Sequence, residues 1–424
     1  MIQRGIGRLR RLEQWEKTLY MMFVAQFTSA VGFSMIFPFL PLYVQEIGST
    51  QGWSLEFAVG LVASVQGFTM MLTSPIWGVL ADRYGRKLMV QRAAFGGAIL
   101  ILWMGFARSA EELVLIRFIQ GGVTGVVSAA NALVAGQAPR SQSGFAMGVI
   151  QVGLWSGVAI GPLIGGVLAD AFGYRTAFIV TAVLLGAAGV LVWFGVQENF
   201  TPPKKDKKQS SNMVADWGRV LTTPGVGITY FLRFMSNMAR MGIFPILPLF
   251  LVTIMATSDR VNTVTGLMIG VTAAASTATA IYLGRLGDRI GHRKVVRGSA
   301  LVAGLVYLPQ SLVTEPWQLF VLQGIAGAAA GGILPALSAL LARYTEPGEE
   351  GNVFGIDNSI GSAGRAVSPL ISTSVAYWFG LRSTFLVTGA MFLCIMLLAI
   401  WKLPKSIPKE NPASSLPTEV RGRG

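Results

Sequence analysis

Arginines that lie inside long apolar stretches are the residues of this chain best suited to chemistry. Arg240 and Arg365 fall near the middle of their stretches, and Arg117 lies about two turns into another. A guanidinium withdrawn from water needs a partner, and its N–H donors match carboxylates and phosphates. These positions predict a cavity that receives an anionic or zwitterionic group. The residues expected to line this cavity are Gln26, Asn131, Arg240, Asp357 and Arg365.

Carboxylates are scarce in the same stretches. Asp357 lies about two turns before Arg365 and is expected to be within its reach. Glu46 stands only near the far end of the first stretch, and no Asp or Glu stands squarely in the middle of any stretch. The residue that would carry a proton is therefore not identified. Arg233 allows two interpretations, a side chain that extends to the membrane surface or one that faces the cavity.

The composition indicates a membrane protein. Of the 424 residues 52% are hydrophobic and only 13% are charged, about half of the roughly 25% that soluble domains carry. The net charge is +14, but the basic residues stand in short runs between apolar stretches, which argues against a nucleic-acid surface. The single cysteine, Cys394, allows no intramolecular disulfide. The single histidine, His292, has no further His or Cys with which to bind a metal.

Twelve apolar stretches are long enough to cross a membrane. About 20 apolar residues span a bilayer, and they do so as a helix because backbone polar groups in hydrocarbon must bond within their own segment. We therefore expect an all-α membrane protein of twelve transmembrane helices, arranged as two pseudo-symmetric six-helix bundles. The stretches run approximately over 19–42, 57–80, 88–106, 113–134, 145–168, 177–196, 226–252, 266–283, 295–313, 317–341, 353–379 and 385–400.

A solvated linker separates the two sets of six. It contains TPPKKDKKQSSN, in which prolines precede lysines and polar residues. Lys and Arg concentrate here and in the other connections on the same side of the membrane, which predicts an inner or plasma membrane protein with both termini cytoplasmic. The expected divisions are an N-terminal arm at 1–17, bundles at 18–197 and 224–402, the linker at 198–223 and a cytoplasmic tail at 403–424.

The two sets of six are copies of one unit. Five short motifs recur in order; for example, PFLP at Pro38 recurs as PILP at Pro245, 207 residues later, and QG at Gln120 recurs at Gln323, 203 residues later. Because six spans intervene, the copies have the same orientation and form a parallel repeat about an axis along the membrane normal.

Charges present in only one copy need a reason other than the fold. Arg240 corresponds to Phe33, and Arg365 corresponds to Val158. A charge at membrane depth is costly and normally marks a transport pathway or a proton relay. This asymmetry strengthens the prediction that both arginines face a substrate.

The second span ends in GVLADRYGRK, and the eighth ends in the related GRLGDRIGHRK. Glycines permit a tight turn, and Asp82 can pair with a helix N-terminus or with an arginine. We interpret this motif as a charged latch that breaks and re-forms between conformations; a plain basic loop is the alternative. The latch residues are Gly78, Asp82, Arg83, Gly85, Arg86, Lys87, Gly284, Asp288, Arg289 and Gly291.

Glycines spaced by four along the fifth span predict a smooth helix face against which another backbone can pack. Pro162 removes one backbone hydrogen bond and bends the helix. We expect this face to form the boundary along which the two halves rock; static packing is the alternative. The residues of this motif are Gly153, Gly157, Gly161, Pro162, Gly165 and Gly166.

Three motifs together resemble one family of transporters. GVLADRYGRK resembles the signature loop of the major facilitator superfamily, RFIQG from Arg117 resembles its fourth-span motif, and GLWSGVAIGPLIGG from Gly153 resembles its fifth-span antiporter motif. The resemblance covers essentially the whole chain and is closest to the bacterial drug–proton antiporter branch. It implies a coupling role for Arg117, Gln120 and Gly121. The chain departs from that branch in lacking a mid-span carboxylate, which argues against a preference for cationic drugs.

These features predict a secondary active transporter, not an enzyme, that exports small amphipathic compounds in exchange for protons by alternating access. We expect it to function as a monomer in the lipid bilayer, with a small-molecule substrate, no nucleic acid, no cofactor and the proton gradient as energy source. No Walker-type phosphate loop occurs in the sequence, so ATP is not the expected energy source.

Two alternatives stay open. One is a flippase or exporter of an anionic lipid or organic anion, because PILPLFL and GGILPALSALLARY also resemble segments of a bacterial glycolipid flippase of the same superfamily. The more remote one is a membrane sensor that has lost transport.

Overall fold

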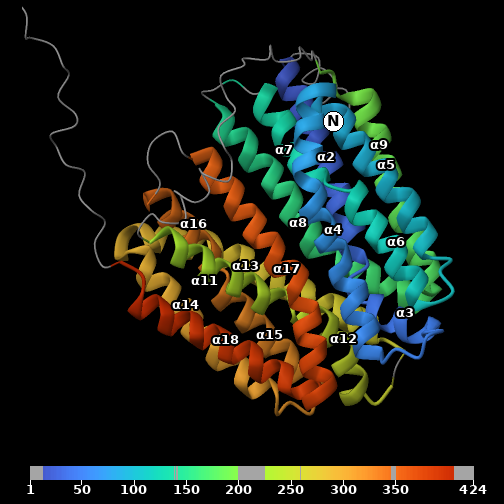
Figure 1. Ribbon diagram of the computed structural model, residues 1–424, viewed down its shortest axis with the longest axis vertical. Helices are drawn as coiled ribbons and strands as arrows, with labels where there is room; N and C mark the ends of the chain where they lie inside the picture. The colour runs from blue at the N-terminus through green and yellow to red at the C-terminus, as the bar shows by residue number, and fades with distance from the viewer. Residues whose placement is uncertain are drawn as a thin grey trace, which may run out of the picture.

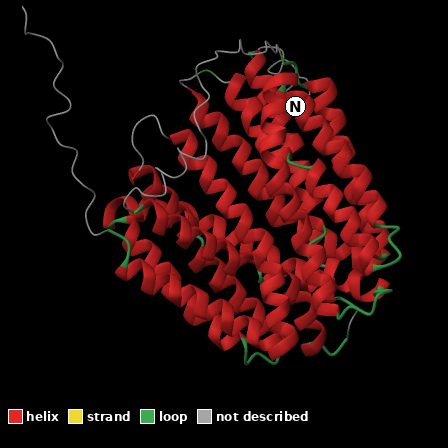
Figure 2. Cartoon of the chain, in the orientation of Figure 1, coloured by secondary structure: helices red, strands yellow, loops and turns green. Residues whose placement is uncertain are grey.

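The structure is a computed structural model that describes residues 13–137, 139, 142–198, 225–257, 259–344 and 350–404. Nearly all of these residues are helical, and no strand occurs among them (Figure 2). Within the described ranges, nine helical segments are long and apolar enough to cross a membrane. The prediction of an all-α membrane protein is confirmed. The predicted arm, linker and tail lie almost entirely outside the described residues, so their boundaries stay predictions.

In the described ranges the helices form twelve rods, eight of them undivided and four divided in two. The undivided helices are α4 (Leu55–Tyr84), α5 (Arg86–Met104), α8 (Ser143–Phe172), α9 (Tyr174–Gly195), α13 (Val261–Ile290), α14 (His292–Gln310), α17 (Glu350–Phe379) and α18 (Leu381–Trp401). The divided spans are α2 (Gln14–Met35) with α3 (Leu40–Ile47), α6 (Ala110–Val123) with α7 (Val126–Gln137), α11 (Val226–Met241) with α12 (Ile243–Ile254), and α15 (Pro316–Ala330) with α16 (Ile333–Tyr344).

A three-helix unit occurs four times along the chain. Each unit contains a divided span, then a long helix, then a shorter one. The long helices α4, α8, α13 and α17 all have 30 residues. At about 1.5 Å per residue such a helix measures about 45 Å, enough for the hydrocarbon core and both headgroup layers. The sequence analysis predicted the twofold repeat of six spans but not this finer fourfold one.

Each long helix ends at a glycine that adopts a positive φ. The angles are 98° at Gly85, 81° at Gly173, 96° at Gly291 and 82° at Gly380, and the next helix begins at the following residue. Residues with a side chain rarely adopt this conformation, which costs them about 1–3 kcal/mol. Glycine thus lets two long helices reverse direction through one residue.

The division of four spans was not predicted, because each apolar stretch was expected to form one helix. The breaks coincide with residues that weaken a helix: Pro38 lies between α2 and α3, Gly125 between α6 and α7, Gly242 between α11 and α12, and Gly331 between α15 and α16. Proline lacks the N–H that continues a helix, and glycine gains little from helical order. Within a bilayer such breaks are tolerated where protein surrounds them.

The helices pack as two groups that correspond to the two halves of the sequence (Figure 1). In the first half α2 packs on α8 and α9, and in the second α11 packs on α17 and α18. The halves meet where α8 packs on α13 and α4 packs on α17. Phe37 and Phe244, which are 207 residues apart and occupy matching places in the repeat, stack with ring centroids 5.6 Å apart. The pseudo-twofold axis therefore passes between these two rings.

Candidate functional site

A single carboxylate joins the two halves at the end of the molecule where α8 ends and α13 begins, here called the far side. Asp170 accepts hydrogen bonds from the backbone N–H groups of Asn262 and Thr263, at 3.3 and 2.7 Å. The Asn262 amide and the Thr263 hydroxyl also donate to it, at 2.7 and 2.6 Å. The first N–H groups of a helix have no partner within that helix, and the helix dipole favours negative charge there. Asp170 of one half therefore caps a helix of the other.

Next to this carboxylate the backbones of α8 and α13 touch. Gly166 leaves no room for a side chain against the carbonyl of Asn262, and Gly266 leaves none against the carbonyl of Pro162. A methyl group at either glycine would force the two helices apart. The far side is therefore closed by close helix packing as well as by the carboxylate.

The opposite end, where α2 begins and α9 ends, is here called the linker side, and there α8 and α13 separate. Gly148 lies 18 residues before Gly166, which is about five turns and therefore the same face of α8. Gly284 has the same relation to Gly266 on α13. Neither Gly148 nor Gly284 has any neighbouring atom within 4 Å of an added Cβ, whereas Gly166 and Gly266 are in contact. The halves are thus closed on the far side and diverge toward the linker side.

The predicted glycine face of the fifth span does not form this boundary. Gly153, Gly157, Gly161 and Gly165 face α2 of the same half, where side chains added to them would press on its backbone or side chains. Of the motif's glycines only Gly166 meets the other half, where the carbonyl of Pro162 also contacts Gly266. The expectation of a moving boundary along the four-spaced glycines is therefore wrong, because residues four apart share one helix face and the next residue turns away by about 100°.

Arg365 lies beside the second contact between the halves. A Cβ added to Gly67 of α4 would stand 3.0 Å from the Cα of Ala366, and one added to Gly364 would stand 2.9 Å from the carbonyl oxygen of Phe234 on α11. Since successive helix residues point about 100° apart, Arg365 points between α11 and α4. Its side chain is exposed and donates to the Ser362 hydroxyl at 2.8 Å.

Arg233 holds the carboxylate that was expected to serve Arg365. The Nε atom of Arg233 lies 2.7 Å from Oδ1 of Asp357, and its Nη1 atom donates to the Ser338 hydroxyl at 2.6 Å. The expected pairing of Asp357 with Arg365 is therefore wrong. Arg233 neither extends to the surface nor stands free, because a buried carboxylate in hydrocarbon binds the nearest cation. The group connects α11, α16 and α17.

Arg240 is half-buried, and its guanidinium donates to the Ser276 hydroxyl on α13 at 3.3 Å. Gln26 is only 1% exposed and lies in the packed interior of the first half, so it lines no water-accessible space in this conformation. Asn131 is half-buried on α7. Of the five residues predicted to line a common cavity, the structure places Arg240, Asp357 and Arg365 in the second half and Gln26 and Asn131 in the first.

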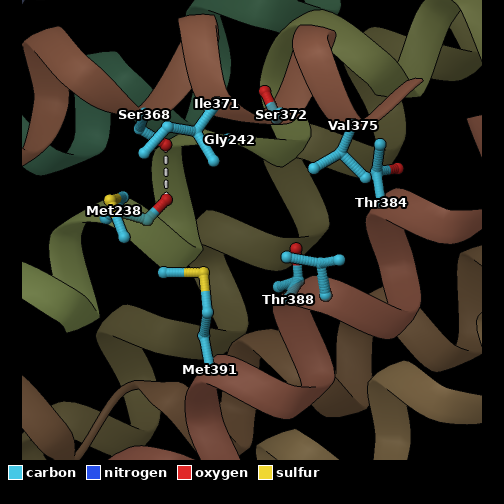
Figure 3. Close-up of a pocket in the computed structure, with 10 residues that line it drawn as sticks. Met238, Gly242, Ser368, Ile371, Ser372, Val375, Thr384, Thr388 and Met391 are labelled. Carbon is cyan, nitrogen blue, oxygen red and sulfur yellow. Dashed lines mark hydrogen bonds between the residues drawn. The ribbon is translucent and has the colours of Figure 1, made fainter. Parts of the chain in front are cut away.

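A small pocket lies between α11, α17 and α18 in the second half. Ser368 and Met238 face each other across it, joined by a hydrogen bond from the Ser368 hydroxyl to the Met238 carbonyl, and the hydroxyls of Ser372 and Thr388 also line it (Figure 3). None of its lining residues is charged, and none was predicted as a site residue.

The predicted coupling residues join the second and fourth spans. Arg117 is 6% exposed; its Nη1 atom donates to the side chains of Gln66 and Gln120, the latter at 3.3 Å. Gly121 lies directly against the backbone of Gln66, so a side chain there would collide. In the second half the matching Gln323 donates to Gln310 at 3.1 Å without any arginine. Gln310 belongs to α14, so the matching glutamine bonds to a different span, and Arg117 links α6 to α4 in the first half alone.

Part of the latch motif lies outside what the structure describes, because the surroundings of Gly78 and the side chain of Asp82 are not described. Beside it lies a residue that the sequence analysis missed. Glu198 accepts the backbone N–H groups of Arg86 and Lys87, at 3.0 and 2.8 Å, and so caps the start of α5. Nothing in the sequence near Glu198 identifies this pairing, because 111 residues separate the partners.

In the second half Asp288 pairs with His292 at 3.2 Å. Arg289 is exposed, and Gly284 and Gly291 have nothing within 4 Å of an added Cβ.

Asp170 was also missed, although the sequence contains a signal for it. GVLAD, with a glycine three residues after its aspartate, ends the second span at Asp82 and also ends the fifth at Asp170, 88 residues later. The following glycines, Gly85 and Gly173, adopt the same positive φ. Adjacent three-helix units run in opposite directions across the membrane, so the same motif lies at the linker side in one copy and at the far side in the other.

Comparison with known proteins agrees with this architecture. The profile described as Major Facilitator Superfamily matches residues 22–258 and 229–422. The multidrug resistance protein MdtG of Serratia proteamaculans (strain 568) is 36% identical over 397 residues, which cover 93% of this chain and 96% of that protein. MdtG of Salmonella paratyphi A (strain ATCC 9150 / SARB42) is 35% identical over 381 residues, 89% of this chain and 93% of that protein.

Solved structures share the fold. A bacterial homolog of the human lysosomal transporter Spinster, in an inward-facing and occupied conformation, matches with a TM-score of 0.75 at 15% identity over 92% of this chain and 97% of its own. The human organic anion transporter MFSD10 matches with a TM-score of 0.66 at 18% identity over 92% of this chain and 100% of its own.

Replacing Asp170 by asparagine is expected to open the far side. The substitution removes the charge that four donors share; a loss of about 2 kcal/mol would raise the population open on that side more than about tenfold. Spin labels on cysteines at Thr50 and Ala256, with Cys394 replaced by serine, measure the opening as a longer distance. Glu46→Gln, another carboxylate on the far side, is the control and should leave the distance unchanged. Equal distances in Asp170→Asn and the wild type would show that the packing alone closes this side.

Proposed function

Because the chain belongs to the major facilitator superfamily and is a secondary transporter of small molecules, we propose that it exports amphipathic compounds in exchange for protons by alternating access. The observation that carries this proposal is the one-sided closure, in which α8 and α13 touch at Gly166 and Gly266 but not at Gly148 and Gly284. A pathway closed at one end and divergent at the other is one of the two states that alternating access requires.

The two GVLAD motifs supply the means of changing state. Asp170 caps the start of α13 while the far side is closed. We infer that Asp82 caps the start of α17 when the linker side closes. The helix α17 begins at Glu350 on that side and packs on α4, which carries Asp82. Each carboxylate would complement a helix dipole in one state only, so that the two states have similar free energies.

The orientation in the membrane is part of the proposal. Lys and Arg concentrate on the linker side, which makes this side cytoplasmic. A cysteine at Gln209, in a protein with Cys394 replaced, should then resist impermeant thiol reagents in intact cells and react after the membrane is opened. Prompt labelling of intact cells would reverse the orientation, and with it the direction of transport.

A pH gradient tests the coupling directly. Proteoliposomes with an imposed gradient are given ethidium, fluorescein or a fluorescent phospholipid analogue, which represent a cation, an anion and a lipid. Movement that follows the gradient and stops when a protonophore collapses it is expected for at least one reporter. If the reporters move at the same rate with and without the pH gradient, the protein is a transporter that is not coupled to protons. No movement would favour a sensor.

Export of an organic anion or anionic lipid is the second candidate, and Arg365 favours it. Its guanidinium is exposed between α11 and α4, while the nearby carboxylate of Asp357 is held by Arg233. An arginine in such surroundings gains from an anionic ligand. One structure of the same fold is the human organic anion transporter MFSD10, which agrees with this candidate.

Arg365→Gln and Arg240→Gln are expected to weaken fluorescein binding by about 1.5–3 kcal/mol, the value of a charge-assisted hydrogen bond, and to spare ethidium. Binding is measured by fluorescence anisotropy on the purified protein. Arg285→Gln, an exposed arginine on α13, provides the control for the same loss of charge. An equal loss for both reporters, together with a lower unfolding temperature, would mean that these arginines are structural.

A further inference from the structure

We propose that Asp357 carries the transported proton and that Arg233 causes its release on the linker side. The inference rests on the proton-coupled exchange proposed above, and it assigns that coupling to one residue. A proton carrier must be a group that gains and loses a proton at the pH of the two compartments, and a carboxyl group next to a movable cation is such a group.

The position of Asp357 distinguishes it from the other carboxylates. In the described helices every other Asp or Glu lies within the first or last turn, whereas Asp357 is the eighth residue of α17. At about 1.5 Å per residue it lies about 10 Å from the start of that helix. A carboxylate that lies beyond the first turn of a membrane helix and is only 4% exposed is costly, and such a group usually serves a relay or a pathway.

In this conformation Asp357 is held by a cation. Arg233 on α11 lies 2.7 Å away and is fixed by the Ser338 hydroxyl on α16. Tyr230 on α11 interacts electrostatically with the pair but donates its hydroxyl to the carbonyl of Val353 at 2.8 Å. On α17 itself, Arg365 adds positive charge facing Arg233. Burial alone would make the carboxyl group of Asp357 retain its proton, whereas the guanidinium of Arg233 beside it favours release of the proton.

A path for the proton to water runs along Arg233. Its side chain is 19% exposed, whereas that of Asp357 is 5% exposed. The far side is closed in this conformation, so a proton leaving the carboxyl group reaches the linker side. The step breaks one O–H bond at Asp357 and transfers the proton to water; when the far side opens, water there returns a proton to the carboxylate. No other reactant is required.

The change of state supplies the second half of the cycle. Arg233 belongs to α11, which forms one part of a divided span, while Asp357 belongs to the undivided α17. A shift of α11 relative to α17 lengthens the ion pair, and a buried carboxylate that loses its cation takes up a proton. Substrate transport and proton transport are then coupled through the distance between Arg233 and Asp357.

The competing explanation is that the ion pair of Arg233 and Asp357 is purely structural. The two explanations differ in whether loss of the carboxyl group separates transport from the pH gradient. Asp357→Asn should abolish the stimulation of ethidium or fluorescein transport by a pH gradient, a loss of at least about tenfold. The same protein should still exchange labelled for unlabelled reporter across liposomes without a gradient, because exchange needs no net proton transfer. Asp357→Glu retains a carboxyl group and should retain a response to the gradient. Glu315→Gln, an exposed carboxylate at the start of α15, is the matched control.

A second measurement does not depend on the reporter. The full-length protein in liposomes is shifted between low and neutral pH, and the infrared difference spectrum is recorded. Exposed carboxylates contribute a band of protonated carboxyl groups in every variant. The component from a buried carboxyl group should be present in the wild type and in Glu315→Gln and be missing from Asp357→Asn.

Three outcomes decide the assignment. Gradient-driven transport by Asp357→Asn would overturn it and leave the proposed function intact. Loss of both driven transport and exchange, in a protein with a normal unfolding temperature, would make the ion pair structural. If the wild type ignores the gradient, the proposed function fails, and the infrared band alone then reports whether Asp357 binds a proton.

Discussion

The contact between Asp170 and the start of α13 is the interaction on which the conformation of the whole molecule depends. It is made of one charge and four donors, two of them backbone groups that have no partner inside their helix. Hydrophobic burial cannot hold two membrane bundles together, since lipid tails are as apolar as the side chains they would replace. Close glycine packing and polar contacts must do so instead. On the far side, where glycine packing and polar contacts occur together, the halves touch. On the linker side, where α8 and α13 have neither, the halves separate.

Scarcity of negative charge governs the interior of the second half. Arg233 takes the carboxylate of Asp357, while Arg240 and Arg365 are left with serine hydroxyls. A hydroxyl satisfies a donor but does not neutralise a charge. The same bundle therefore contains one neutralised arginine and two that keep their positive field. In the proposed mechanism this distribution separates two tasks, because the paired site would respond to protons and the two unpaired sites to anionic cargo.

Much of the fold could be predicted from the sequence, because the bilayer imposes a pattern that is readable residue by residue. Twelve apolar stretches, the repeat and the turn at Gly85 all follow from hydrophobicity and glycine placement. Partners distant in sequence could not be predicted. Asp357 stands eight residues before Arg365 but pairs with Arg233, and Glu198 caps α5 from more than a hundred residues away. The GVLAD motif at Asp170 was present in the sequence, but its meaning depends on which helix of the other half it meets.

The one-residue glycine turns have a mechanical consequence. Two long helices joined by a single residue have almost no freedom to move independently, and they also pack on a common set of neighbours. The chain therefore contains four stiff hairpins, α4–α5, α8–α9, α13–α14 and α17–α18, each with a turn at a glycine of positive φ. The remaining four described spans are each interrupted, at Pro38, Gly125, Gly242 and Gly331. In a rocking motion of the kind proposed, these four interruptions are the places where a span can bend, and the hairpins would move as units.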